Sequence, residues 1–151
     1  MNFPKADDGH VTPRRGDAER AQRQQIAVAV VEHEETFLVG IRPVGVPLAG
    51  MSEFPGGKIL AGESPAQAAE RECREETGLE VIVVGTYSVV EHEYAHGRLT
   101  LHFFRCRLGE SETAKEPAAP FRWVAREELA RLQFPDGNRD VIAEILRNGA
   151  L

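Results

Sequence analysis

Acidic side chains are concentrated in residues 69–78, which have the sequence AERECREETG. Glu72, Glu75 and Glu76 are three and four residues apart, a pattern that places three carboxylates on one face of a helix. Like charges at this spacing destabilise a helix by about 0.2–0.5 kcal/mol per pair, and acids near the C-terminal end also oppose the helix dipole. A hard divalent cation would remove that repulsion. The segment alone fits either a metal-binding face or a solvated face with salt bridges to the intervening arginines.

The helix that carries these acids has local start and stop signals. Ser64 is suited to the N-cap and Pro65 to the first helical position, where the missing N–H of proline costs nothing. Gln67, three residues after Ser64, can complete a capping box. Gly78 can end the helix in a left-handed conformation. These signals predict a helix that begins after Ser64 and ends at Gly78.

The other elements follow from the pattern of apolar residues. Residues 25–31 (QIAVAVV) predict a strand buried on both faces, and residues 36–42 predict its hairpin partner. Further along the chain we expect two long β segments, a short strand, a short helix and a final helix, at residues 79–94, 98–108, 121–124, 125–132 and 139–148. This order predicts an α+β fold, with a mixed sheet covered by helices on both faces rather than a doubly wound parallel sheet.

Length and composition limit the possible classes of protein. The 151 residues are 42% hydrophobic and 28% charged, which fits one soluble domain. Residues 1–23 are rich in charge, Pro and Gly and predict a flexible tail, so the single domain is expected at 24–151. A formal charge of −6 argues against a nucleic-acid polymer as partner but leaves a small anionic ligand open.

Cysteine content and hydropathy bear on location. Cys73 and Cys106 give neither a disulfide framework nor zinc-ligand spacing, which favours a reducing compartment. The longest apolar runs are too short for a secretory signal or a membrane span. We therefore expect a cytoplasmic monomer or homodimer with no membrane partner.

The acidic helix lies within a longer motif. From Gly57 to Leu79 the chain reads GKILAGESPAQAAERECREETGL, which matches Gly-x5-Glu-x7-Arg-Glu-U-x-Glu-Glu-x-Gly-U, where U is a bulky apolar residue. Cys73 stands at one U position, a small change for a residue that behaves as a compact hydrophobe. The chain here resembles the Nudix hydrolases. The resemblance implies a Nudix fold, an α/β/α sandwich with a central mixed sheet and a loop–helix–loop that holds Mg²⁺, for which Mn²⁺ can substitute. It also implies hydrolysis of a nucleoside diphosphate linked to another group.

The same resemblance implies roles for the acids of the motif. Glu75 and Glu76 would ligate the metal together with the carbonyl of Gly56. Glu72 would either ligate the metal or take the proton from the attacking water, and it is the expected catalytic residue. A glutamate in the later loop TAKEPAAP, Glu116, would complete the metal site.

Two further residues of the motif are expected to support the metal ligands without binding the metal. By the resemblance, Glu63 and Arg71 would form an ion pair that holds the loop and the helix in register. A purely structural ion pair is nearly the same prediction.

Segments outside the motif narrow the resemblance to the MutT-type nucleoside triphosphate pyrophosphohydrolases. These segments are QIAVAVV, EFPGGK, the strand after Arg98 and FPDGN, and the likeness runs from about residue 25 to 146. In that family the Asn after the FP turn reads the nucleobase, which corresponds to Asn138. An amide presents a donor beside an acceptor and so matches the O6 and N7–H of 8-oxoguanine. The alternative is that Asn138 only caps the last helix.

The remaining substrate contacts carry over more loosely. Arg42 and Lys58 are predicted to meet phosphate oxygens, and Arg98 and Phe54 to contact the base or ribose. For the charged residues a plain surface position is the alternative, and for Phe54 it is a place in the core.

The reaction that the resemblance implies is attack of water on the β-phosphorus of a nucleoside triphosphate, giving the monophosphate and pyrophosphate. An oxidised deoxynucleotide such as 8-oxo-dGTP is the expected substrate, which would be a DNA-repair function. One alternative keeps the chemistry on CTP, a modified dCTP or a nucleotide sugar. Another alternative is a Nudix-like module that senses nucleotides without cleaving them.

Overall fold

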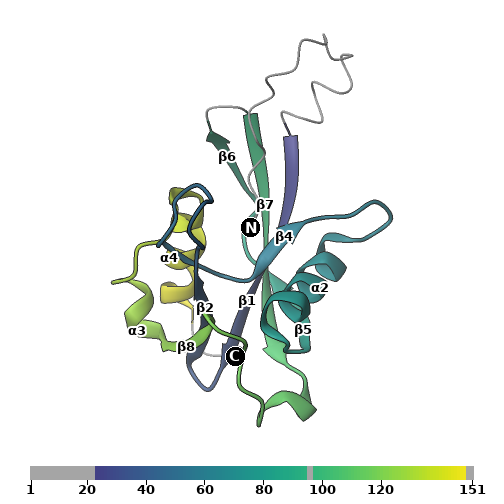
Figure 1. Ribbon diagram of the computed structural model, residues 1–151, viewed down its shortest axis with the longest axis vertical. Coiled ribbons are helices and arrows are strands. Elements are labelled where there is room, and N and C mark those ends of the chain that lie inside the picture. The colour runs from purple at the N-terminus through teal and green to yellow at the C-terminus, as the bar shows by residue number, and fades with distance from the viewer. Residues whose placement is uncertain (1–22, 95–96, 149–151) are drawn as a thin grey trace.

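The computed structural model describes residues 23–94 and 97–148 (Figure 1). Its first element, β1 (Arg23–His33), begins at the last residue of the expected tail. Residues 1–22 lie outside the described residues, so the flexible tail stays a prediction. No helix within the described part of the chain is long and apolar enough to cross a membrane.

The centre of the molecule is one mixed sheet built on β1. Its main path has the order β3-β2-β1-β7-β5. The strands of this path besides β1 are β2 (Thr36–Ile41), β3 (Ser52–Glu53), β5 (Val81–Thr86) and β7 (Gly97–Leu108). β1 runs parallel to β7, in register from Arg23 opposite Arg98 to Glu32 opposite Arg107, and antiparallel to β2. Three further strands attach to this path: β4 (Gly56–Lys58) to β1, β6 (Val90–Tyr94) to β7, and β8 (Arg122–Ala125) to β2.

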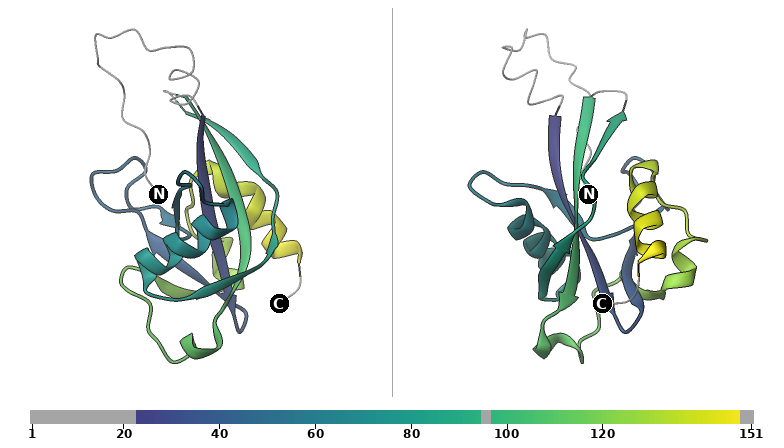
Figure 2. Two further views of the ribbon diagram at one scale, coloured as in Figure 1. Left: turned by 90° about the vertical axis from the view of Figure 1, so that its right-hand side faces the viewer. Right: turned by 180° about the vertical axis from the view of Figure 1, so that it is seen from behind.

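Helices cover both faces of the sheet. α2 (Pro65–Thr77) lies on one face, and α3 (Arg126–Leu129) with α4 (Arg139–Arg147) lies on the other (Figure 2). There are also two short 3₁₀ turns. η1 (Glu110–Glu112) follows β7, and η2 (Asp136–Asn138) directly precedes α4. The predicted α+β sandwich is confirmed.

Alternation along β1 divides the core into two layers. Ile26, Val28 and Val30 belong to the cluster that contains residues of α3 and α4, whereas Ala27 and Ala29 belong to the cluster that contains α2. All five are completely buried, as expected for a strand buried on both faces. The small alanines leave room for α2 to approach the sheet closely.

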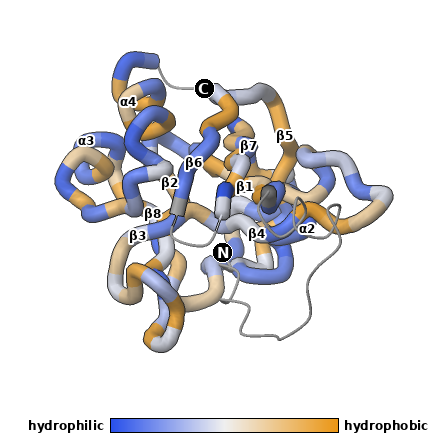
Figure 3. Tube along the Cα trace, turned by 90° about the horizontal axis from the view of Figure 1, so that it is seen from above, coloured by the Kyte–Doolittle hydropathy of each residue, from blue (hydrophilic) through white to orange (hydrophobic). Residues whose placement is uncertain are grey.

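The first of the two expected long β segments is interrupted. β5 and β6 both pair antiparallel with β7, but three residues separate the pair Thr86–Phe104 from the pair Val90–Leu101 on one strand and only two on the other. The extra residue cannot join the ladder, so the strand breaks between Thr86 and Val90. A second irregularity lies between Val83 and Gly85. The trace of β5 is nevertheless hydrophobic along most of its length (Figure 3).

Candidate active site

Helix α2 begins and ends where its sequence predicts. The Ser64 side chain accepts from Gln67 N at 3.1 Å, and the Ser64 backbone N–H donates to the Gln67 side chain at 2.9 Å. Gly78 has φ of 77° and donates to Arg74 O at 2.9 Å, which closes the last turn. The buried face of the helix includes Ala69 and Cys73. This packing fixes which way the acidic face of α2 points.

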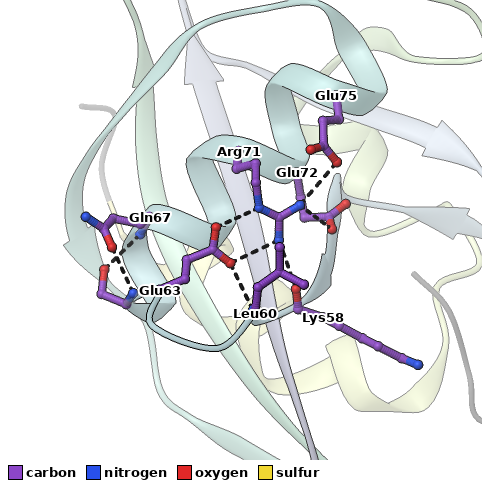
Figure 4. Close-up of polar contacts among 8 residues, drawn as sticks. Lys58, Leu60, Glu63, Gln67, Arg71, Glu72 and Glu75 are labelled. Carbon is purple, nitrogen blue, oxygen red and sulfur yellow. Dashed lines mark hydrogen bonds and ion pairs between the residues drawn. The ribbon is translucent and has the colours of Figure 1, made fainter.

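Arg71 connects the helix to the loop that precedes it (Figure 4). Its guanidinium forms a bidentate pair with Glu63, with distances of 2.6 and 3.0 Å, and donates to the carbonyl of Lys58 at 3.0 Å. The remaining nitrogen, Nη1, donates to Glu72 at 3.0 Å and to Glu75 at 3.1 Å. All the N–H donors of a guanidinium are thereby used. The pair with Glu63 has the geometry that would hold loop and helix in register.

Glu72 and Glu76 lie against the glycine pair of β4. The backbone N–H of Gly56 donates to Glu76 Oε1 at 3.2 Å. A methyl group on Gly57 would lie 2.5 Å from Cδ of Glu72, and one on Gly56 would lie 2.6 Å from the carbonyl oxygen of Ala27. Only glycines allow the strand to approach both β1 and the acidic helix this closely.

The environment of Glu76 disfavours its negative charge. Burial raises the pKa of its carboxyl to about 7, and the nearby carboxylates of Glu53 and Glu72 act in the same direction, while the Gly56 N–H opposes them. A bound cation would reverse this balance, because it would neutralise the charge that burial penalises. The oxygen donors and their excess negative charge fit a hard divalent ion.

Glu75 is the most exposed of the three acids. Its side chain is 55% exposed, and it shares Nη1 of Arg71 with Glu72. Within residues 23–94 and 97–148, no three acidic, His or Cys side chains are already gathered as a metal site. Glu75 is paired with Arg71 and, among the described residues, is not gathered with other acids at a metal site, so its ligand role stays a prediction.

Arg42 is not on the surface. Its side chain is fully buried, where it pairs with Glu53 at 3.1 Å and donates from Nε to the carbonyl of Pro47 at 2.9 Å. Contact with a phosphate would require this pair to open. This placement favours a role in holding the loop between β2 and β3. The sequence did not indicate the pairing of Arg42 with Glu53, although Glu53 lies in the EFPGGK segment.

The other charged candidates are exposed and spread over the molecule. The side chain of Lys58 points away from the Arg71 network (Figure 4). Arg98, at the start of β7, pairs with Glu93 of β6 at 3.1 Å. Glu116 is exposed in the segment between η1 and β8. Two residues further on, Ala118 N donates to the carbonyl of Thr77 at 2.9 Å, so this segment is attached to the end of α2.

Two of the candidate base-contacting residues, Phe54 and Asn138, lie on the side of the sheet that α4 covers. Phe54 is 1% exposed and stacks on Phe134 with ring centroids 4.9 Å apart, so it has the core position that was its alternative. Asn138 is 2% exposed and occupies the N-cap position of α4, but its side chain makes no capping hydrogen bond. Its Nδ2 instead contacts the carbonyl of Pro135 at 3.3 Å. The backbone of Asn138 occupies the cap, and its side-chain amide does not act as the cap.

Comparison with known proteins shows the family of this chain. The model of the NUDIX domain family matches residues 26–144. The 8-oxo-dGTP diphosphatase of Escherichia coli K12 is 32% identical over 127 residues, which are 83% of this chain and 98% of that protein. The CTP pyrophosphohydrolase of the same strain is 31% identical over 78% of this chain and 85% of its own.

A solved structure of a related protein leads to the same family. The MutT protein of methicillin-resistant Staphylococcus aureus 252, a Nudix hydrolase, superimposes with a TM-score of 0.68 and 27% identity, covering 84% of this chain and 98% of that one. The chain belongs to the NUDIX domain family. In its own structure the loop and helix α2 that carry the motif pack on a mixed sheet. Within that family it is a hydrolase of the MutT type that acts on pyrophosphate bonds.

Proposed function

We propose that this protein is a Mg²⁺-dependent nucleoside triphosphate pyrophosphohydrolase that removes oxidised deoxynucleotides such as 8-oxo-dGTP. The observation that carries the proposal is the contact of Glu72 and Glu76 with the glycine pair of β4, beside a fully engaged Arg71. Nudix hydrolases generally use a divalent metal ion. The choice of Mg²⁺ rests on the oxygen-only donor set.

Glu72, Glu75, Glu76 and the Gly56 carbonyl would hold the metal, with Glu116 completing the set. When bound, the ion would neutralise the triphosphate and lower the pKa of the attacking water. Glu72 would accept the proton of that water, while Arg71 and Glu63 keep the carboxylate aligned. The water oxygen forms a bond to the β-phosphorus, and the bond between that phosphorus and the α–β bridging oxygen breaks. The products are the nucleoside monophosphate and pyrophosphate.

The nucleobase would be read at the other side of the sheet. The buried amide of Asn138, free of any capping bond, offers a donor and an acceptor to an oxidised purine. The 8-oxo-dGTP diphosphatase of E. coli, which this chain matches over most of its length, favours this substrate class. The likeness to a CTP pyrophosphohydrolase makes CTP or a modified dCTP the second candidate.

We also propose that the protein acts in the cytoplasm, as a monomer or homodimer, on free nucleotides. A net charge of −6 gives no broad positive surface for a polymer backbone, whereas a metal-bound triphosphate needs only a local site.

The direct test is release of pyrophosphate from a panel of nucleotides, including 8-oxo-dGTP, dGTP, CTP and a nucleotide sugar, with and without Mg²⁺. Glu76→Gln and Glu75→Gln should each abolish turnover, while the far-ultraviolet circular dichroism spectrum stays native. Glu70→Gln is the matched control, because it removes one negative charge from the same helix outside the Arg71 network, and it should retain activity.

Two outcomes would contradict the proposal. Near-normal turnover of Glu75→Gln with a folded spectrum would remove that residue from the metal site. Tight nucleotide binding by the wild type without any product, in the presence of Mg²⁺, would favour a sensing module over an enzyme.

A further inference from the structure

Glu112 is a charged residue with no exposed surface in a segment that is otherwise polar and open. It ends η1, in the connection from β7 to β8, and its relative exposure is 0% while its neighbours Ser111 and Thr113 are exposed. The proposed chemistry does not use this carboxylate. A buried carboxylate survives in a fold only when its oxygens are well partnered, so its partners indicate what it does.

Glu112 binds the turn that follows helix α2. Its Oε1 accepts the backbone N–H of Glu80 at 2.7 Å, and its Oε2 lies 2.5 Å from Nζ of Lys115. Both partners lower the pKa of the Glu112 carboxyl, Lys115 more than the Glu80 N–H. The carboxylate therefore links the connection from β7 to β8 with the residue that leads from α2 into β5.

Two backbone hydrogen bonds extend this attachment along the same connection. Gly109 N donates to the carbonyl of Glu80 at 3.0 Å, and Ala118 N donates to the carbonyl of Thr77 at 2.9 Å. The connection is thus attached to the C-terminal end of α2 before and after Glu116, and it passes beside that end of the helix in Figure 2.

These attachments place Glu116 close to the acidic helix. Thr77 directly follows Glu76, the acid that contacts Gly56. Glu116 precedes Ala118 by two residues, so its Cα lies within about 7 Å of the Cα of Ala118 even for fully extended chain. A loop held at this point can present the Glu116 carboxylate to a metal ion bound by the acids of α2.

We propose that Glu112 is a positioning residue that fixes the loop carrying Glu116 against the metal-binding helix. This inference rests on the proposed function, in which Glu116 completes the metal site. Glu112 itself touches neither metal nor substrate. It acts by holding the backbone before Glu116 to the turn after α2, while the hydrogen bond from Ala118 N to Thr77 O holds the backbone after it.

The test measures binding of Mn²⁺ alone, by electron paramagnetic resonance without nucleotide. Glu112→Ala removes both contacts and leaves the Glu80 N–H without its acceptor, so it should weaken Mn²⁺ binding by about tenfold, as loss of outer-shell partners commonly does. Glu112→Gln keeps an acceptor for Glu80 N and should restore most of the affinity. Glu110→Gln, an exposed acid of the same turn, is the matched control and should bind like wild type.

A double-variant cycle with Glu116 separates positioning from simple stabilisation. If Glu112 acts through Glu116, then Glu112→Ala in a Glu116→Gln background should weaken Mn²⁺ binding no further. If Glu112→Ala does not fold, Glu112→Asp takes its place, because the shorter side chain must pull the loop, and the same expectation holds.

The proposal is overturned if the Glu112 variants lower the melting temperature but leave Mn²⁺ affinity unchanged, or if the two substitutions weaken binding multiplicatively. It is also overturned if Glu116→Gln alone leaves Mn²⁺ affinity unchanged. Because the cycle requires no turnover, failure of the nucleotide panel to show hydrolysis would reject the proposed function without deciding the role of Glu112.

Discussion

Glu76, a candidate metal ligand, lowers the stability of the metal-free native state when its carboxyl is ionised. Its pKa lies at about 7 in the folded protein, above the ordinary value of 4.5, chiefly because burial disfavours the charged form. A carboxyl whose pKa is raised by folding destabilises the native state progressively as pH rises from its ordinary value through its folded value. The loss of stability is therefore absent below the ordinary pKa of 4.5 and reaches its full value above the folded pKa of about 7.

Replacing this acid should make the metal-free protein more stable at high pH. We expect Glu76→Gln to melt close to the wild type at about pH 5 and above it at about pH 8, because only the wild type must bury a charge at the higher pH. Thermal unfolding in the presence of a chelator measures the difference. A variant that is less stable than wild type at the higher pH would show that Gly56 and its surroundings stabilise the charged form.

Asn138 provides the residue-scale test of base selection. Loss of a buried hydrogen bond costs about 0.5–1.5 kcal/mol, and more where a partner is left unsatisfied. Asn138→Ala should therefore raise KM for 8-oxo-dGTP several-fold more than KM for dGTP. Asn138→Asp can still accept from N7–H but would face O6 with repulsion, so it should also lose the preference. Steady-state kinetics on both nucleotides give the comparison.

The competing explanation for Asn138 makes the opposite prediction. If the residue served only α4, both variants would lose stability and keep their substrate preference. The Asn138 side chain makes no capping hydrogen bond and instead donates to the carbonyl of Pro135 at 3.3 Å, so a loss of stability in these variants would come from that buried contact and not from the helix cap.

At the scale of elements, the contact between β4 and α2 depends on the absence of a side chain at Gly57. An added methyl group would lie 2.5 Å from Cδ of Glu72, the end of a flexible side chain that can move away. Gly57→Ala should therefore fold, but it should displace the Glu72 carboxylate, raise the Mg²⁺ concentration needed for half-maximal activity and lower kcat.

Gly85 is the matched control for this substitution. A methyl group there would meet nothing closer than 3.8 Å, so Gly85→Ala should leave the Mg²⁺ requirement unchanged. Circular dichroism of both variants, together with Mg²⁺ titrations of activity, makes the comparison. Wild-type Mg²⁺ dependence in Gly57→Ala would mean that Glu72 does not need its position beside β4.

The elements also differ in how far sequence alone predicted them. The bounds of α2 were predictable because capping signals act between residues a few positions apart. The pairing of Arg42 with Glu53 and the contact of Glu112 with Glu80 were not predictable, because these residues lie 11 and 32 positions apart in the chain. Polar composition alone indicates solvent exposure for such residues, and only the fold brings in the partner that makes burial tolerable.

At the scale of the whole molecule, the candidate metal ligands of α2 and the candidate base-reading residues near α4 lie on the two faces of the sheet. The short segment from β3 to β4 connects them, since Phe54 packs in the layer of α4 while Gly56 and Gly57 contact the acids of α2. A nucleotide whose base lies near Asn138 and whose phosphates lie near Glu76 would follow this segment. The metal site would then act on the phosphate chain away from the nucleoside.

The proposed chemistry predicts which bond breaks. Turnover of the triphosphate in ¹⁸O-labelled water should place the label in pyrophosphate, because attack at the β-phosphorus adds the water oxygen to that product and leaves the bridging oxygen on the monophosphate. Mass spectrometry of both products, with unlabelled water as control, locates the label. Label found only in the monophosphate would indicate attack at the α-phosphorus and a substrate shifted along the site. Direct release of orthophosphate from the triphosphate would exclude a pyrophosphohydrolase altogether.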